Sequence, residues 1–221
     1  MRYYPVNLDV RGRACLVVGG GKVGTRKVGT LLECGARVKV VSPETDRRLE
    51  RLAGRGAIEL LRKKYESGDL EGVFLVIGAT DDQALNRRIH QDARHTGCLC
   101  NIADRPELCD FILPSVVQRG DLVISVSTSG RSPAFAKHLR QELEDRFGEE
   151  YGRFLELMGA IRKQLLAAGH APEAHRELFA QLVASDLPEL IKAGDHERID
   201  RVLQDVLGPG FAYRQLMSRT T

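Results

Sequence analysis

The chain of 221 residues contains no tryptophan, and aromatic residues make up only 5% of it. It also lacks a strong excess of charge, since its formal net charge is +3. A base-stacking surface needs aromatic side chains and a nucleic-acid groove needs basic ones, so nucleic acid is not an expected partner. Long apolar runs are absent as well, and each run is far shorter than the roughly 20 residues that span a bilayer. Membrane insertion is therefore not expected.

The first residues, from Met1 to Pro5, lack the apolar core of a secretory signal peptide, which predicts a cytoplasmic protein. The five cysteines are an odd number and mostly lie in apolar stretches, which favours buried, reduced thiols over a disulfide framework. Cys98 and Cys100 lie two residues apart without a second Cys/His pair at metal-site spacing. The six histidines show no such spacing either, so no protein-bound metal is expected.

Over the first two-thirds of the chain, short apolar runs alternate with amphipathic stretches. This is the pattern of βαβ units around a parallel sheet and predicts an α/β fold. Helices are predicted from about residue 23 to Cys34, from Pro43 onward, and over residues 82–95, and Gly35 is expected to end the first of them. Strands are predicted at residues 14–18, 37–41, 58–61, 73–79 and 99–103.

The pattern changes near Phe111. Two β-rich runs, residues 111–118 and 122–128, are joined by Arg-Gly-Asp and predict a hairpin. Ser132 as N-cap and Pro133 at the first helical position then predict a helix that runs to about Phe147. Three apolar stripes at helical spacing predict three short helices beyond it: Phe154, Leu157, Met158, Ile161 and Leu165; Leu178, Phe179, Leu182 and Val183; Ile199, Val202, Leu203 and Val206.

A turn of sequence Gly-Gly-Gly-Lys-Val-Gly, beginning at Gly19, follows the first predicted strand and opens a helix. In this context the glycine pattern predicts a dinucleotide site. Gly19 permits the tight turn, Gly21 lets the backbone approach a pyrophosphate, and Gly24 lets helix and strand pack closely. Lys22 and Val23 begin the helix, whose free N–H groups face the phosphates. The alternative is a glycine-rich turn without a ligand.

The end of the second predicted strand lacks the acid that usually binds the adenosine ribose. Ser42, Pro43 and Glu44 stand there instead, and Ser42 or Glu44 is the candidate for the ribose hydroxyls. Arg47 and Arg48 follow closely and raise NADP as the alternative to NAD, although a solvated helix face explains them as well. We expect NAD.

Thr80 follows the fourth predicted strand, at the sheet edge where cofactors lie in open α/β sheets. It is a further candidate for cofactor contact. Asp82, two residues on, is instead a candidate cap of the next helix.

Six blocks of the chain resemble the precorrin-2 dehydrogenases, which form the N-terminal half of bacterial sirohaem synthases, in the family's order and spacing. The resemblance is strong over residues 1–148 and rests mainly on length and helix number beyond. It implies a Rossmann-type domain over residues 1–112, a small β-rich dimerisation segment over 113–148, a helical domain over 149–221, and a homodimer. The blocks are Val17–Lys27, Val41–Glu44, Ala79–Asp82, Cys100–Asp104, Phe111–Ser115 and Ser127–Pro133.

The resemblance implies NAD-dependent oxidation of precorrin-2 to sirohydrochlorin, and some members of the family also insert Fe²⁺. It identifies Asp104 as the catalytic aspartate. A base suits this reaction, because the substrate loses a proton together with the hydride. The same carboxylate can accept pyrrole N–H protons during metal insertion. The alternative for Asp104 is a turn residue with a side-chain hydrogen bond to the nearby backbone.

A tetrapyrrole rich in carboxylates needs anion-binding groups. The loop before Pro133 offers hydroxyls and backbone N–H groups at a helix N-terminus, although it also fits an ordinary polar loop. Asn101 either binds the substrate or ties down the strand end. The candidate substrate-binding residues of the loop are Ser127, Thr128, Ser129, Gly130 and Ser132.

Two alternatives to this function stay open at the level of sequence. One is a dehydrogenase without chelatase activity, because the same aspartate would serve both reactions. The other is a regulatory module that only senses NAD. The enzyme is favoured, because a sensor needs neither Asp104 nor the loop that begins at Ser127.

Overall fold

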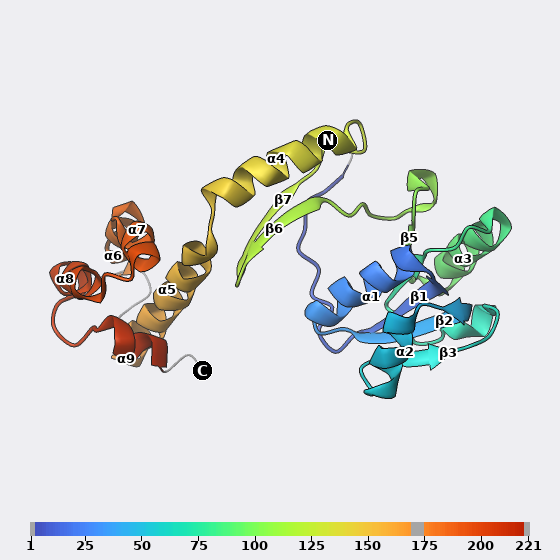
Figure 1. The fold of residues 1–221 in the computed structure, drawn as a ribbon, viewed down its shortest axis with the longest axis horizontal. Helices are drawn as coiled ribbons and strands as arrows, with labels where there is room; N and C mark the ends of the chain where they lie inside the picture. Colours follow the sequence, from blue (N-terminus) through green and yellow to red (C-terminus); the bar gives the residue numbers. More distant parts are fainter. Residues whose placement is uncertain (1–2, 169–174, 219–221) are drawn as a thin grey trace. The chain divides into compact units, whose positions relative to one another are not determined.

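The computed structural model describes residues 3–168 and 175–218. The chain forms two compact units, Met1–Leu113 and Pro114–Thr221, and each has its own core (Figure 1). Membrane insertion was not expected, and none of the described helices is long and apolar enough to cross a bilayer.

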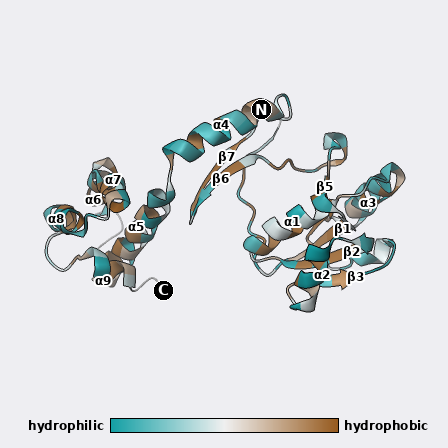
Figure 2. Ribbon diagram, in the orientation of Figure 1, coloured by the Kyte–Doolittle hydropathy of each residue, from teal (hydrophilic) through white to brown (hydrophobic). Residues whose placement is uncertain are grey.

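The first unit is built on a sheet of five parallel strands in the order β3-β2-β1-β4-β5. This order places β1 at the centre of the sheet, and the strand is buried on both faces from Cys15 to Val18. In Figure 2 the sheet strands stand out in brown against the largely teal helices. The α/β prediction is confirmed. The strands are β1 Ala14–Gly20, β2 Arg37–Thr45, β3 Glu59–Leu61, β4 Leu75–Gly78 and β5 Leu99–Ile102.

Helices cover both faces of this sheet. Val28 of α1 and Leu49 of α2 pack with one set of strand side chains, and Ile89 of α3 packs with the opposite set. As predicted, α1 ends where Gly35 takes a left-handed φ of 74°. The helical elements of the unit are α1 Lys22–Glu33, α2 Arg47–Gly54 and α3 Gln83–Thr96, with short 3₁₀ turns η1 Ser67–Leu70 and η2 Pro106–Leu108.

The expectation that Pro43 opens a helix is wrong. Strand β2 continues to Thr45, and α2 begins only after Asp46, whose carboxylate accepts the Arg48 N–H at 2.8 Å. Proline is tolerated here because the ladder jumps from the pair Val18–Val41 to the pair Gly20–Thr45, which leaves Pro43 outside the regular pairing.

In the second unit, β6 (Ser115–Arg119) and β7 (Leu122–Val126) form the predicted antiparallel hairpin, with Gly120 at φ 55° in its turn. The strand predicted to begin at Phe111 begins four residues later. The Phe111 carbonyl already accepts a bond from the Asn101 side chain, and Pro114 has no N–H to donate. Helix α4 (Pro133–Arg146) starts at the predicted cap.

The remaining described helices bury a separate core. The prediction of three helices is wrong, because α7 and α9 were missed. They are short, and a stripe of one or two turns gives no clear period. Val183 is 64% exposed, because it lies 100° around α6 from the buried Leu182. The helices are α5 Glu149–Ala167, α6 His175–Ala184, α7 Leu187–Ala193, α8 His196–Leu207 and α9 Tyr213–Ser218.

Candidate active site

Gly19 and Gly24 of the turn are required by the fold. Gly19 has φ 112°, and a Cβ there would lie 2.2 Å from the Ala79 carbonyl oxygen. A Cβ on Gly24 would lie 2.0 Å from the Gly19 carbonyl oxygen. These contacts match the tight-turn and close-packing roles that the sequence predicts for the two positions.

Gly21 differs, because nothing within the protein requires a glycine there. Its φ is −77°, and a Cβ would meet no atom within 4 Å. It is the N-cap of α1 and has no side chain to accept a capping bond, so the first N–H groups of the helix, on Lys22 and Val23, are left without a side-chain acceptor. A phosphate at a helix N-terminus uses such N–H groups. The turn therefore fits the pyrophosphate of a dinucleotide.

The residues at the end of β2 differ in how accessible their side chains are to a ligand. Ser42 is buried, and its hydroxyl donates to the Glu44 carbonyl at 2.6 Å, so its proton is already used. Pro43 and Glu44 are exposed beside the glycine turn. Of the predicted ribose ligands, Glu44 is the one with an exposed polar side chain.

At the end of β4, Thr80 belongs to a hydrogen-bonded corner. Its hydroxyl lies 2.9 Å from Oδ1 of the buried Asn86, whose amide donates back to the Thr80 carbonyl. Asp82 caps α3 as predicted and accepts from two backbone N–H groups, at 2.8 and 3.0 Å. Thr80 is half-buried at the carboxyl edge of the sheet, where its position remains compatible with cofactor contact.

Asp104 follows β5 and has a left-handed backbone with φ 60°. Its side chain is exposed, and among the described residues the carboxylate has no hydrogen-bond partner. The turn is held instead by the bond from the Arg105 N–H to the Ile102 carbonyl. The turn-residue alternative required a side-chain bond to the nearby backbone, and this is not present. A strained residue with a free carboxylate at a sheet edge points to function.

Cys109 fixes the other side of this turn, a role that the sequence did not suggest. Its sulfur accepts the Ile102 N–H at 3.2 Å and lies 3.1 Å from the Arg105 carbonyl oxygen. Burial raises the pKa of the thiol. The residue therefore acts as a neutral hydrogen-bonding group that holds the chain on both sides of Asp104.

Lys27 of α1 was also missed, although it lies in the glycine-turn block. Its side chain is half-buried, and burial lowers the pKa of its ammonium group. The Arg26 charge lowers this pKa further, whereas the Asp104 carboxylate raises it. The charges of Lys27 and Asp104 are thus close enough to interact, and the burial of Lys27 is a signal that the sequence alone does not carry.

Asn101 is buried, and its amide donates to the Phe111 carbonyl at 2.9 Å. This contact ties the segment after η2 to β5. The sequence left two roles open for Asn101, substrate binding and a structural hydrogen bond at the strand end, and the structure shows the hydrogen bond.

The predicted substrate loop lies in the second unit and is ordered by its own hydroxyls. The Thr128 hydroxyl donates to the Ser132 carbonyl and accepts the Ser132 N–H, while Ser132 caps α4 by accepting from Phe135. Ser129 has φ 53° and its N–H donates to the Ser127 hydroxyl. Gly130 is left-handed too, with φ 80°. The loop is thus a preformed turn with the Ser129 hydroxyl free to bind.

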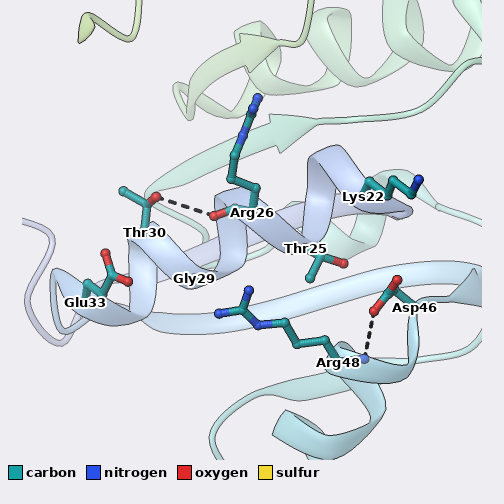
Figure 3. A pocket seen from close by; sticks show the side chains of 8 residues that line it. All are labelled: Lys22, Thr25, Arg26, Gly29, Thr30, Glu33, Asp46 and Arg48. Carbon is teal, nitrogen blue, oxygen red and sulfur yellow. Dashed lines mark hydrogen bonds between the residues drawn. The ribbon is translucent and has the colours of Figure 1, made fainter. Parts of the chain in front are cut away.

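A groove of about 370 Å³ runs between α1 and the start of α2 (Figure 3). Lys22 and Asp46 lie at one end of it and Glu33 at the other. The Thr25 hydroxyl is buried beside it and has no hydrogen-bond partner in the described parts of the chain. The lining residues are Lys22, Thr25, Arg26, Gly29, Thr30, Glu33, Asp46 and Arg48.

Within the described residues no three side chains of His, Cys, Asp or Glu are grouped to hold a metal ion. His170, one of the six histidines, lies outside the described residues.

Three families match successive parts of the chain. Residues 6–115 match a family of NAD(P)-binding domains, residues 119–146 match the central region of sirohaem biosynthesis proteins, and residues 150–207 match the sirohaem synthase dimerisation region. The chain belongs to the sirohaem synthase family. The family resemblance inferred from the six sequence blocks is confirmed, and the first unit carries an NAD(P)-binding domain.

Curated relatives agree with this membership. The siroheme synthase of Nitrosococcus oceani is 37% identical over 215 residues, which are 97% of this chain and 46% of that protein. The siroheme synthase of Methylococcus capsulatus is 38% identical over 203 residues, or 92% of this chain and 43% of that protein. The chain thus spans somewhat less than half the length of these relatives.

Among solved structures, the precorrin-2 dehydrogenase SirC matches with a TM-score of 0.77 and 28% identity. The match covers 92% of this chain and 98% of that one. The predicted order of a Rossmann-type sheet, a β-rich segment and helices is therefore confirmed.

Proposed function

We propose that the protein oxidises precorrin-2 to sirohydrochlorin, with NAD as the hydride acceptor and with release of a proton. One observation carries the proposal: the exposed, unpaired carboxylate of Asp104 and the open N-terminus of α1 stand at the carboxyl edge of one parallel sheet. Ligands of open α/β sheets bind at that edge. The relatives named above support the choice of substrate.

The chain's own residues would hold the dinucleotide as follows. The N–H groups of Lys22 and Val23 bind the pyrophosphate across Gly21. Pro43 and Glu44 flank the adenosine half, and Thr80 lines the path toward the nicotinamide. When bound, NAD supplies the site that takes the hydride.

Asp104 is the proposed base. Loss of a hydride from precorrin-2 must be matched by loss of a proton, and a carboxylate without a hydrogen bond among the described residues is ready to accept it. Its left-handed backbone is kept in place by η2 and by the Cys109 contacts. Lys27, whose charge interacts with that of Asp104, supplies positive charge from which a substrate rich in carboxylates benefits.

The loop from Ser127 to Ser132 is proposed to bind substrate carboxylates. Ser129 and Gly130 turn the backbone so that a hydroxyl and N–H groups are presented at the N-terminus of α4. Asn101 enters the proposal only as the support of the strand end. We further propose a homodimer that works in the cytoplasm, where free thiols such as those of this chain stay reduced.

The test is anaerobic turnover of precorrin-2 with NAD, followed as NADH absorbance. Asp104→Asn is expected to lower kcat by about 100-fold or more, because general-base catalysis contributes that much, while NAD affinity and melting temperature stay unchanged. Asp81→Asn, which neutralises another exposed carboxylate after a strand, is the matched control. Full NADH production by Asp104→Asn would show that Asp104 is not the base.

The same experiment separates the alternatives. Wild-type protein that binds NAD without any turnover would be a sensor and not an enzyme. Addition of Fe²⁺ or Co²⁺ to sirohydrochlorin then measures chelation. A rate no faster than without protein would identify a dehydrogenase that lacks chelatase activity.

A further inference from the structure

The acid that the sequence analysis does not find at the end of the second strand is present in the fold. The sequence places the strand end at Val41, so the next side chains, Ser42 and Glu44, were the candidates for the ribose. In the structure β2 ends at Thr45. The residue that directly follows the strand is therefore Asp46.

The register of the sheet brings Asp46 to the glycine turn. After the pair Val18–Val41 the ladder resumes at Gly20–Thr45, and the Asp46 N–H donates to the Gly20 carbonyl at 2.9 Å. A Cβ on Gly20 would lie 2.4 Å from the Glu44 carbonyl oxygen, so the approach depends on a glycine at this position. The chain after β2 is thus hydrogen-bonded to the glycine turn, where the pyrophosphate of the dinucleotide is proposed to bind.

The Asp46 carboxylate is oriented and partly free. Its Oδ1 accepts the Arg48 N–H at 2.8 Å, which fixes the side chain as the cap of α2, and among the described residues Oδ2 has no hydrogen-bond partner. The side chain is exposed and shares one end of the groove with Lys22 (Figure 3). Ser42, in contrast, is buried and its proton is used.

We propose that Asp46 accepts the hydroxyls of the adenosine ribose and thereby makes the site select NAD over NADP. An acid roughly 20 residues beyond the glycine turn has this function in dinucleotide-binding folds generally. The basic side chains nearby, those of Lys22 and Arg48, would attract a 2′-phosphate, and the Asp46 carboxylate repels it. The inference rests on the proposed NAD-dependent function and names the residue that sets its cofactor preference.

The test is the affinity of the full chain for NADH and NADPH, read from the fluorescence of the nicotinamide. Asp46→Asn keeps an oxygen that can cap α2 but loses the charge. We expect this variant to bind NADH about tenfold more weakly, since a hydrogen bond to a charged group contributes on that order, and to bind NADPH as well as the wild type or better. Asp46→Ser, which also places a good N-cap before α2, is expected to show the same changes in affinity. That result would exclude unfolding of helix α2 as their cause.

Glu33→Gln, which neutralises an exposed carboxylate at the other end of the same groove, is the matched control and should leave the ratio of the two affinities unchanged. The inference is overturned if Asp46→Asn preserves that ratio, if Glu33→Gln shifts it as much, or if the wild type prefers NADPH. A wild-type protein that binds neither dinucleotide would contradict the proposed function itself.

Discussion

Among the described residues, Asp104 and Ser129 are the only ones other than glycine that have a positive φ. Both belong to the predicted sites. A left-handed backbone costs a residue with a side chain roughly 1 kcal/mol or more. The sequence pointed to the residues by resemblance, but the strain that sets them apart is visible only in the structure.

Gly21 offers a clean test of the cofactor site. Gly21→Ala is expected to lower the melting temperature only slightly, by the poorer capping of α1, because its Cβ would touch nothing and its φ is ordinary. NADH affinity should fall by about tenfold or more, because the Cβ occupies the space through which a pyrophosphate approaches the backbone. Fluorescence titration measures the affinity.

Two other glycines serve as controls for that variant. Gly54→Ala adds a Cβ in open space at the end of α2 and should change neither property. Gly24→Ala should unfold the first unit, because its Cβ would overlap the Gly19 carbonyl. Normal NADH binding by Gly21→Ala would argue against a pyrophosphate at this turn.

The buried thiols predict a loss of stability at high pH. Burial raises the pKa of Cys15 and Cys98 to about 11 and that of Cys100 to about 12, from an ordinary 9.0. Between pH 9 and these values the unfolded chain has lost protons that the folded chain keeps, so the free energy of unfolding falls as the pH rises. Each thiol contributes about 1.4 kcal/mol per pH unit in this window.

Urea unfolding at pH 7.5 and pH 10 measures this loss. Cys100→Ala should flatten the pH dependence, whereas Cys34→Ala, which removes an exposed thiol, should not. If the free energy of unfolding of Cys100→Ala falls between the two pH values as much as that of the wild type, the Cys100 thiol of the wild type ionises without unfolding.

At the scale of elements, helix ends follow closely from the sequence. Asp82→Ala is expected to destabilise the first unit by about 1 kcal/mol, because it removes both bonds to the first turn of α3. Asp82→Asn should retain most of that free energy, since asparagine caps equally well. Asp81→Ala is the control, and a similar loss there would point to charge and not to capping.

Elements whose boundaries depend on pairing are harder to predict. Caps and glycine stops, such as Ser132 and Gly35, are local and were predicted correctly. The end of β2 was predicted wrongly, because a proline at position 43 is typical of a helix start and only the pairing of Gly20 with Thr45 shows that the strand continues. For the same reason the acid at Asp46 was overlooked.

At the scale of the whole molecule, the two units have separate cores. A fragment of residues 1–113 is therefore expected to fold alone and to bind NADH as tightly as the full chain. A cooperative thermal melt by circular dichroism and the fluorescence titration check this. A fragment without a cooperative transition would show that its core needs the rest of the chain.

The proposed homodimer makes a further prediction. Val116 and Val123 are 40% and 47% exposed on one face of the β6–β7 hairpin, and a two-stranded sheet is marginal by itself. Val123→Asp is expected to give a monomer in sedimentation velocity. Val183→Asp, an exposed valine of α6, should remain dimeric. The reverse result would place the interface on the helices that match the dimerisation region.

The sequence by itself determined the alternation of strands and helices, the glycine turn, the helix caps and the family. These depend on neighbours along the chain, and local geometry decides them. Only the tertiary structure decided that the Asp104 carboxylate has no hydrogen-bond partner among the described residues and that Cys109 bonds the chain on both sides of it. The structure likewise decided that the Asn101 amide donates to the Phe111 carbonyl and that Asp46 reaches the glycine turn. Each of these depends on register, burial or backbone strain, which residues distant in sequence impose when they pack together.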